Sequence, residues 1–516
     1  MRQAMVLIWG ACAALAQTPG ALCPATMHAK PSGDWNGWAD PGNTRFQGAA
    51  AAGVTAQSAR RLRLKWAFGF PAGATAFGTP SVYQGRVLVG GADGSVFSLD
   101  ARTGCTYWSY QAVAGVRTAP VAGNGRVYFG DLKGNVYAVG AERGDLVWKV
   151  RAEEHPMAVI TGSPKLDSGR LYVPVSGRDE SMAAANPSYE CCTFRGSVVA
   201  LDAATGAKIW QAYTIEEEPK PRGNNAKGAR RWGPSGAAPW SSPTLDLQKR
   251  RLYIGTGVNY SNPPTKTSDA ILAFDLDSGR MLWSRQLTSG DSYNFACGTQ
   301  DKTNCPKDPF IDADFGNSGI LQRLEGGKRI LAASDKSGMV YGIDPDREGE
   351  IVWRRKIAAG GVNGGTMWGG ASDSRGVAYV GISDFTTGQP ERGGGLVALK
   401  LATGEKLWAA AAPKPTCLGR AGCSSAQPAP VTAIPGVAFL GSWDGHLRAY
   451  ETSRGEILWD FDTARDFQTV NGVRAHGGSI ISMGAAVAGG MVYATSGYSG
   501  NGMPGNALLA FSVDGK

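Results

Sequence analysis

The sequence predicts an all-β protein, an eight-bladed β-propeller whose repeats each dock a tryptophan between neighbouring sheets. Three observations carry this prediction. A tail motif, Leu-Asp-Ala-x-Thr-Gly-x-x-x-Trp, recurs along the 516 residues, as in Leu201 to Trp210. The composition, with 73 Gly, 15 Trp and only 18% charged residues, suits short strands and tight turns. The repeats also return at the period of propeller blades.

Each copy reads as three or four short strands of alternating apolar residues, separated by Gly or Asp-Gly turns. The first runs from Thr79 through Gly104, and its tail ends at Trp108. Strands near the C-terminus complete the eighth copy, and the segment Asp34 to Trp66 is expected to supply the outer strand that closes the ring. A seven-bladed ring with one degenerate copy is the alternative. The docking series is Trp66, Trp108, Trp148, Trp210, Trp283, Trp353, Trp408 and Trp459.

The spacing of these tryptophans locates the insertions. The intervals are 42, 40, 62, 73, 70, 55 and 51 residues. An interval of about 40 residues corresponds to a blade without insertions, so the third, fourth and fifth copies carry inserted segments. Loops inserted on a rigid scaffold are where binding and catalytic residues concentrate.

The N-terminus reads as an export signal. Residues 1–16 combine Arg2, an apolar run from Ala4 to Leu15 and a small-residue cleavage site at Ala14 to Ala16. A retained anchor is the alternative, although the run is short for a membrane span. Residues 17–33 then form an N-terminal segment and 34–516 the propeller. We expect a periplasmic or secreted protein without a membrane span.

Export makes disulfides plausible. Nine cysteines less Cys12, in the signal, leave an even number. They fall into pairs, with Cys23–Cys105 reached by elimination and the least secure. The four expected pairs are Cys191–Cys192, Cys297–Cys305, Cys417–Cys423 and Cys23–Cys105.

The net charge of +9 comes from scattered Lys and Arg. The tightest clusters, Arg60 to Arg63 and Lys249 to Arg251, are interpreted as solvated strand ends. With no helix-rich domain either, the sequence does not indicate a nucleic-acid partner. A weak basic field of this kind can steer an acidic redox partner or polymer.

The adjacent pair Cys191-Cys192, within Tyr189 to Arg195, is the most distinctive motif. Two neighbouring cysteines can close an eight-membered ring across one peptide bond, and such strained elements cluster at functional sites. The ring would form a flat apolar plate on which a planar cofactor stacks. The alternative is that the two cysteines pair elsewhere or stay free.

These features resemble the eight-bladed quinoprotein alcohol dehydrogenases, and more closely their polyvinyl alcohol dehydrogenase branch. The resemblance covers about residues 35 to 516. It implies pyrroloquinoline quinone (PQQ) and a calcium or lanthanide ion in the central funnel. The matching stretches are Tyr189 to Asp202, Trp283 to Gly298, Asn471 to Gly478 and Gly497 to Asn506.

The resemblance implies roles for five cofactor-binding residues. The Cys191-Cys192 plate would cover one face of the quinone, and Trp240 the other. Lys336 matches a basic residue that contacts the quinone oxygens, and Arg195 is placed to meet a cofactor carboxylate with two hydrogen bonds. The alternatives are a core tryptophan at Trp240 and a solvated turn lysine at Lys336.

Two residues match the family's metal ligands. Their carboxylate and amide carbonyl oxygens are of the kind that a hard cation prefers. Glu180 lies where the family has its metal-binding glutamate, with Asp179 as the neighbouring alternative. Asn259 resembles the family's Gly-Thr-Gly-Asn ligand, with one residue inserted. The ion would polarise the quinone carbonyl as a Lewis acid. A surface acid and a turn asparagine are the plain alternatives.

The sequence departs from the family at the catalytic base. Methanol-type enzymes end an Asp-x-Trp-Asp motif in the catalytic aspartate, whereas this chain reads Asp291-Ser-Tyr-Asn294. An asparagine cannot accept the proton, so we predict that Asp291 is the base. Asp312 and Asp314 lie in the same long insertion, and a pocket altered for a different substrate is the alternative.

None of the four histidines follows a Cys-x-x-Cys-His motif, so no covalent haem is expected. Electrons would then pass to a separate cytochrome c or another acceptor. The resemblance implies a dehydrogenase that oxidises a secondary alcohol to a ketone, with polyvinyl alcohol as a candidate polymer substrate. The alternative from another class is a noncatalytic propeller that scaffolds partners through its loops.

Overall fold

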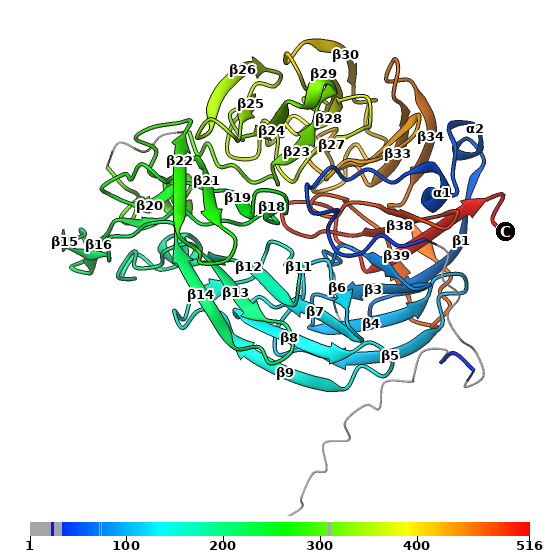
Figure 1. The fold of residues 1–516 in the computed structure, drawn as a ribbon, viewed down its shortest axis with the longest axis horizontal. Coiled ribbons are helices and arrows are strands. Elements are labelled where there is room, and N and C mark those ends of the chain that lie inside the picture. The colour runs from blue at the N-terminus through cyan, green and yellow to red at the C-terminus, as the bar shows by residue number, and fades with distance from the viewer. Residues whose placement is uncertain (1–21, 25–32, 72, 74, 308, 310) are drawn as a thin grey trace, which may run out of the picture.

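Eight β-sheets stand in a ring in the computed structural model, which describes residues 22–24, 33–71, 73, 75–307, 309 and 311–516 (Figure 1). The predicted export signal at 1–16 lies outside the described residues. Eight blades are present, so the eight-bladed prediction is confirmed over the seven-bladed alternative. Every blade is antiparallel, and its first strand lies nearest the ring axis.

The first four blades have these strands. Blade 1 contains β2 (Ser81–Tyr83), β3 (Arg86–Gly90), β4 (Ser95–Asp100) and β5 (Thr106–Gln111). Blade 2 contains β6 (Val121–Gly123), β7 (Arg126–Gly130), β8 (Asn135–Gly140) and β9 (Leu146–Arg151). Blade 3 contains β10 (Ala158–Val159), β11 (Lys165–Asp167), β12 (Arg170–Gly177), β13 (Ser197–Asp202) and β14 (Lys208–Tyr213). Blade 4 contains β18 (Thr244–Asp246), β19 (Arg251–Gly255), β21 (Ala270–Asp275) and β22 (Met281–Gln286).

The remaining blades continue the ring. Blade 5 contains β23 (Ile320–Arg323), β24 (Arg329–Ser334), β25 (Met339–Asp344) and β26 (Glu350–Lys356). Blade 6 contains β27 (Ala371–Ser372), β28 (Val377–Ile382), β29 (Gly395–Lys400) and β30 (Lys406–Ala411). Blade 7 contains β31 (Thr432–Ile434), β32 (Val437–Gly441), β33 (His446–Glu451) and β34 (Ile457–Asp462). Blade 8 contains β37 (Ala486–Ala488), β38 (Met491–Ser496), β39 (Ala507–Val513) and, as its outer strand, β1 (Leu62–Gly69).

Short elements occupy the segments between these strands. Three small sheets pair β15 (Lys220–Asn224) with β16 (Arg230–Gly233), β17 (Ser235–Gly236) with β20 (Asn259–Ser261), and β35 (Asp466–Phe467) with β36 (Ala475–His476). The helices are α1 (Ala49–Ala52), α2 (Ala56–Ala59), α3 (Asp179–Ala185), η1 (Phe295–Gly298) and η2 (Glu325–Gly327). None of the helices among the described residues has the length and apolar character needed to cross a bilayer.

The ring closes by pairing the two ends of the chain. Strand β1 pairs antiparallel with β39, with Leu62 opposite Val513 and Gly69 opposite Ala507. The predicted closing strand is therefore present, at the C-terminal end of the segment assigned to it. This pairing completes blade 8 as a four-stranded sheet built from both ends of the chain.

The recurring tryptophans dock between blades, as the repeat predicts. The Trp66 indole donates to the carbonyl of Ala101 in the next blade at 3.3 Å, and its ring covers Gly104. A Cβ at Gly104 would come within 2.8 Å of that ring, and its φ of 75° also favours glycine. The same contact recurs at Gly144, Gly206, Gly279, Gly349, Gly404 and Gly455, so the turn glycine of each of these tails packs against the tryptophan of the preceding blade.

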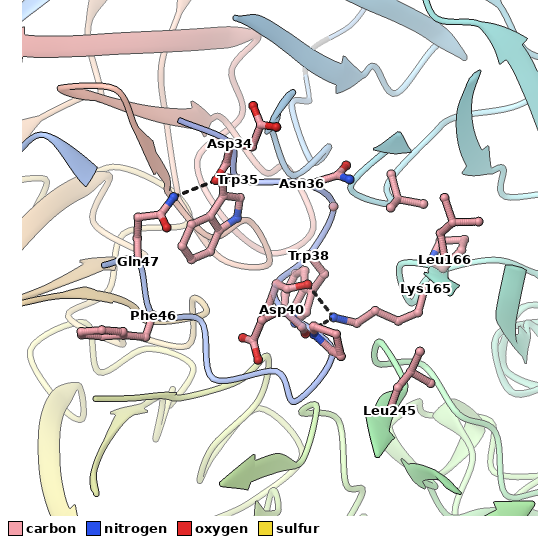
Figure 2. A pocket seen from close by; sticks show the side chains of 15 residues that line it. Asp34, Trp35, Asn36, Trp38, Asp40, Phe46, Gln47, Lys165, Leu166 and Leu245 are labelled. Atoms are coloured by element: carbon pink, nitrogen blue, oxygen red, sulfur yellow. Dashed lines mark hydrogen bonds between the residues drawn. The ribbon is translucent and has the colours of Figure 1, made fainter. Parts of the chain in front are cut away.

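Residues 34–47 form a segment that the sequence did not predict, here called the N-terminal strap. It crosses one end of the ring and hydrogen-bonds to the innermost strand of all eight blades (Figures 1 and 2). Lys165 in blade 3, for example, donates to the carbonyls of Ala39 and Asp40 at 2.8 and 2.6 Å. The blade residues contacted are, in order, Val82, Ala122, Lys165, Leu245, Leu321, Ser372, Ala433 and Val487.

All four expected disulfides form, including the least secure. Cys23–Cys105 ties the chain ahead of the strap to blade 1. Cys191 and Cys192 are bonded to each other, as the plate requires. The other two, Cys297–Cys305 and Cys417–Cys423, close short loops.

Candidate active site

A buried ion cluster joins the fourth and fifth blades near the ring axis. The ammonium of Lys336, at the turn after β24, donates to Asp312 at 3.0 Å and to Asp314 at 2.7 Å. All three side chains are buried. Asp314 also accepts the backbone N–H of Val258 at 2.7 Å, so the cluster is fixed to blade 4.

One ammonium faces more carboxyl groups than it can neutralise. Burial alone would lower the pKa of Lys336, but Asp312 and Asp314 hold it well above its ordinary value. Burial, with the charge of Asp314, raises the pKa of Asp312 to about 8. Burial and the two aspartates also raise the pKa of Glu180 well above its ordinary value. The site therefore favours an added cation or a retained proton.

Helix α3 links this cluster to the disulfide plate. Glu180 belongs to the cluster, whereas its neighbour Asp179 is fully buried and organises the cysteine loop. The Asp179 carboxylate accepts the N–H groups of Thr193 and Phe194 at 2.8 and 2.7 Å, and the hydroxyl of Tyr189 at 2.6 Å. Asp179 thus supports the plate, and Glu180 is the acid left for a metal.

Asp291 lies in the same buried region with one oxygen free. Its Oδ2 accepts the N–H of Ala313 at 2.9 Å, while Oδ1 is buried without a hydrogen-bond partner. Burial raises its pKa, and Asp314 adds to the shift. The carboxyl of Asp269 is also buried with both oxygens unpartnered, and burial and Asp291 raise its pKa well above the ordinary range. Buried unpartnered polar groups are rare and mark functional positions.

The side chain of Asn294 makes structural hydrogen bonds with both its nitrogen and its oxygen. Its amide donates to the carbonyls of Tyr260 and Asn304 at 3.0 and 2.8 Å, and lies 4.0 Å from the Cys191 sulfur. Its oxygen caps helix η1 through the N–H of Ala296. The residue at the family's base position thus holds the plate in place.

Two tryptophans and an arginine converge at the ring axis. Trp240 meets Trp368 edge to face at 4.7 Å, and the Lys336 ammonium lies 5.5 Å from the centre of the Trp240 ring. Gly316 lies against the same ring, where a Cβ would come within 1.8 Å. The Arg117 guanidinium stacks 4.2 Å from the Trp368 ring. Trp240 is therefore part of the axial site, not a blade-core tryptophan.

The hydrogen bonds of Asn259 do not leave its oxygen free. Its amide nitrogen donates to the Ser235 carbonyl at 2.9 Å, and its oxygen accepts the N–H of Thr265 at 2.7 Å. That oxygen would have to leave Thr265 to reach a metal. The geometry therefore supports Glu180 as a ligand more directly than Asn259.

Arg195 lies apart from the ion cluster in the described contacts. Its guanidinium donates to the carbonyls of Ile215 and Glu216 at 3.2 and 2.9 Å, and stacks 4.0 Å from the Tyr213 ring. These contacts brace the segment after β14. They do not place Arg195 with Trp240 or Lys336, so its predicted cofactor contact remains a prediction.

The residues present fit the chemistry of an acidic, planar cofactor with a metal. A guanidinium nitrogen of Arg117, Nη2, and the Trp368 indole nitrogen are both buried without partners, as donors awaiting an acceptor would be. The two free oxygens of Asp269 suit a hard cation. Among the described residues, no three His, Cys, Asp or Glu side chains are already gathered around one point as metal ligands.

Sequence reasoning missed Arg117, Trp368 and Asp269. Arg117 and Trp368 each precede the first strand of a blade, Arg117 in Arg-Thr-Ala-Pro and Trp368 in Trp-Gly-Gly-Ala. Residues at this place in each repeat face the ring axis, which is the signal that could have found them. Asp269, with a φ of 47°, lies in a turn where an aspartate is unremarkable.

Two family models of PQQ-type propellers match most of the chain. The family described as outer membrane protein assembly factor BamB matches residues 50–225 and 336–510. The family of the glucose/ethanol/alcohol dehydrogenase β-propeller domain matches residues 181–302, which contain the disulfide plate and Asp291.

Two similar curated proteins are both named polyvinylalcohol dehydrogenase. The protein from Pseudomonas sp. is 38% identical over 99% of this chain and 82% of its own length. The protein from Sphingopyxis sp. (strain 113P3) is 37% identical over 96% of this chain and 78% of its own length.

Solved structures agree on the fold. The quinohemoprotein alcohol dehydrogenase from Comamonas testosteroni superimposes with a TM-score of 0.68 over 95% of this chain and 82% of that chain, at 19% identity. A europium-containing methanol dehydrogenase gives 0.67 over 94% of this chain and 98% of that chain, also at 19% identity. At this identity the likeness shows the fold alone.

Proposed function

The chain belongs to the PQQ-dependent quinoprotein alcohol dehydrogenases, in the branch that contains the polyvinyl alcohol dehydrogenases, and from this premise we propose that it oxidises secondary alcohols, including those of polyvinyl alcohol, to ketones. We propose further that it works outside the cytoplasm and passes its electrons to a separate cytochrome c. The observation that carries the proposal is Asp291, a buried carboxyl with one free oxygen beside the Lys336 cluster.

The residues that would hold the cofactor are those of the axial site. Trp240 and the Cys191-Cys192 plate offer flat surfaces, Lys336 a buried cation, and Arg117 a free guanidinium donor. Glu180 and Asp269 offer oxygens for a calcium or lanthanide ion. When bound, PQQ accepts the hydride of the alcohol and the metal acts as a Lewis acid.

Asp291 performs the proton transfer in this proposal. The N–H of Ala313 occupies its Oδ2, which leaves Oδ1 to take the hydroxyl proton as the carbinol hydrogen leaves as hydride. The alcohol thus loses one proton and one hydride and becomes a ketone. Lys336 stays protonated between Asp312 and Asp314, which fixes a positive charge where negative charge develops.

Reconstitution tests this function. The purified protein would be supplied with PQQ and either calcium or a lanthanide, and dye reduction followed with 2,4-pentanediol and with polyvinyl alcohol. Turnover that requires both quinone and metal is expected, and the ratio of the two rates separates polymer from small alcohols. No quinone binding by absorbance or thermal shift, with either metal, would contradict the proposal.

A further inference from the structure

A cavity of about 310 Å³ lies between the N-terminal strap and the innermost strands of blades 2, 3 and 4 (Figure 2). We call it the strap cavity. The strap lines it with residues 34–41, Phe46 and Gln47, and the blades line it with Val121, Lys165, Leu166 and Leu245 among others. Its volume is at the lower end of the range typical of ligand sites, about 300 to 1,000 Å³. None of the residues assigned to the candidate active site lines it, so it is a separate cavity.

The walls of the strap cavity are largely apolar. Figure 2 shows Trp35 and Phe46 on one side of it and Leu166 and Leu245 on the other. Phe46 and Leu166 are only half-buried, so part of each side chain is available to a ligand. Apolar area that a ligand removes from water there stabilises the bound state. The cavity is therefore suited to hold a carbon chain.

Polar atoms without partners complete the lining. The indole nitrogens of Trp35 and Trp38 are donors with no acceptor among the described residues, and the two side chains are only 5% and 7% exposed. Gln47 donates through its nitrogen to the carbonyls of Asp34 and Val487 at 2.8 and 3.1 Å, and its oxygen accepts no hydrogen bond from the same part of the chain. Buried indole N–H groups usually have an acceptor. The cavity thus offers donors and an acceptor of the kind that hydroxyl groups pair with.

The charges around the strap cavity balance each other. Asp34 and Asp40 supply two carboxylates, and Lys165 supplies a buried amine, whose pKa burial lowers to about 7. The buried guanidinium of Arg45 adjoins the lining, 5.3 Å from the centre of the Trp35 ring. An anion would meet the two carboxylates, and a cation would meet Arg45, so the cavity is complementary to neither charge. An uncharged ligand is favoured.

The strap cavity is distinct from the catalytic centre. Trp38 lines it and also lines a small axial cavity with Arg117, Trp240 and Trp368, so one side chain is shared by the two spaces. Asp291 lines neither of them. An alcohol held in the strap cavity is therefore not placed for proton transfer, and it is held there without reacting.

A polymer can benefit from a site that does not react. Polyvinyl alcohol carries repeated hydroxyl groups on a carbon chain, so one segment can fill the strap cavity while another enters the catalytic centre. A first attachment makes the next binding event intramolecular, and overall affinity can then exceed that of either site by about 10² to 10⁴. A small diol reaches only one site at a time and gains nothing from the second.

We propose that the strap cavity binds a segment of an uncharged polyhydroxyl chain and anchors a polymer substrate while another segment of the same chain is oxidised. This inference rests on the proposed function, which supplies the polymer. No covalent bond changes in the cavity. Hydroxyl groups pair with the free indole N–H groups and the Gln47 oxygen, and the carbon chain covers the apolar walls.

Calorimetry tests the anchoring site without turnover. The full chain, before PQQ is added, would be titrated with polyvinyl alcohol. Leu166→Trp fills the cavity and should lower the affinity about tenfold. Its control is Leu321→Trp, at a half-buried leucine on the innermost strand of blade 5 that does not line the cavity, and this variant should bind as the parent does.

A second variant removes an aromatic wall in place of filling the cavity. Phe46→Ala should lower the affinity roughly fivefold. Phe467→Ala, at a half-buried phenylalanine that packs against the same hydrophobic cluster, should leave it unchanged. Polyacrylate, which carries carboxylates on the same kind of carbon backbone, should not compete. Parental affinity in both Leu166→Trp and Phe46→Ala, or competition by polyacrylate, would overturn the proposal.

Steady-state kinetics give an independent measurement. In Leu166→Trp supplied with PQQ and metal, KM for polyvinyl alcohol is expected to rise roughly tenfold, while KM for 2,4-pentanediol and kcat for both substrates keep their parental values. An equal rise for both alcohols would overturn the anchoring site, because Leu166 would then act on the catalytic centre or on the fold. Absence of quinone-dependent turnover in the parent would contradict the proposed function instead, and the calorimetric comparison would still decide the strap cavity.

Discussion

Several carboxyl groups lie close enough to the single Lys336 ammonium to share its field, which favours an added cation or retained protons. Glu180, Asp269, Asp291 and Asp312 all have raised pKa values, in each case chiefly because burial disfavours the charged form. Clusters of this kind are retained where chemistry needs them, since they cost stability. The same residues can therefore be tested through both activity and folding.

Asp291→Asn is expected to lower kcat by roughly 10² to 10⁴-fold, because the amide cannot accept the hydroxyl proton. PQQ binding, followed by absorbance, should persist, because Asp291 is not among the residues offered to the quinone ring. Asp301→Asn, an exposed acid in the same insertion, is the matched control. A variant with parental kcat would remove Asp291 from the role of base.

Activity should also fall at low pH. A base with a raised pKa is ionised only above that raised value, so the rate is expected to climb as the pH rises through it. The measurement is kcat/KM against pH at saturating quinone and metal. A flat profile between pH 5 and pH 9 would contradict general-base catalysis by this carboxyl.

Asp312 predicts a pH dependence of stability with a definite sign. Its folded pKa, about 8, lies above the unfolded value near 3.8, so the folded state retains a proton that the unfolded state loses. The contribution is fully present below about pH 4 and is lost as the pH rises toward 8. The parent should therefore lose free energy of unfolding as the pH rises from 5 to 9. The Asp312→Asn variant should lose less over the same range, by roughly 1 kcal/mol or more. Urea unfolding at both pH values measures it, and an unchanged pH dependence would contradict it.

At the level of elements, the N-terminal strap explains how the ring axis is closed at one end. Arg45 is its best-held residue, only 1% exposed. Its guanidinium donates to the carbonyls of Trp38 and Val431 at 2.6 and 2.8 Å, and to the Thr432 hydroxyl at 2.6 Å. It also stacks 4.5 Å from the Trp38 ring. One side chain thus fastens the strap to itself and to blade 7.

Arg45→Met should destabilise the protein by about 2 to 4 kcal/mol, because several buried carbonyls lose their donor at once. Arg63→Met, at an exposed position on β1, is the matched control and should change stability by less than about 0.5 kcal/mol. Thermal unfolding of the two variants compares them directly. Equal midpoints would mean that the strap adds little to the folded state.

The sequence predicted the elements that repeat and missed those that occur once. The tail Gly-x-x-x-Trp appears in nearly every blade, so periodicity reveals both the strands and the docking role of tryptophans such as Trp108. The strap has no second copy, and its polar residues read as an ordinary linker. Its hydrogen bonds join positions up to 440 residues apart, which no local pattern can reveal.

The residues of the candidate site likewise fall into those that a motif predicts and those that only the fold brings together. Cys191-Cys192 and Asp291 lie in motifs with fixed spacing, so their positions were predictable. Arg117 and Trp368 meet only because blades 2 and 6 face each other across the axis. Asn259 and Arg195 matched by motif, but their hydrogen bonds are decided by neighbours that the motif does not include.

At the level of the whole molecule, stability depends on closing the ring at the joint between blades 7 and 8. Trp459 makes this connection. Its indole donates to the carbonyl of Leu62 on β1 at 2.9 Å, and its ring packs edge to face against Phe511 on β39 at 5.1 Å. One tryptophan thus touches both the first and the last strand of the propeller.

Trp459→Ala should cost about 3 to 5 kcal/mol, because it opens a cavity at the joint and removes a contact between the chain's two ends. Trp353→Ala is the matched comparison. Trp353 docks in the same way, to the Leu401 carbonyl at 2.7 Å, but it is more exposed, and the blade on which it docks is formed by one continuous stretch of chain. A smaller loss is expected there, because no strand of blade 6 comes from a distant part of the chain as β1 does in blade 8. Calorimetric and urea unfolding of both variants would measure the difference. Equal losses would show that the joint is no more critical than any other interface in the ring.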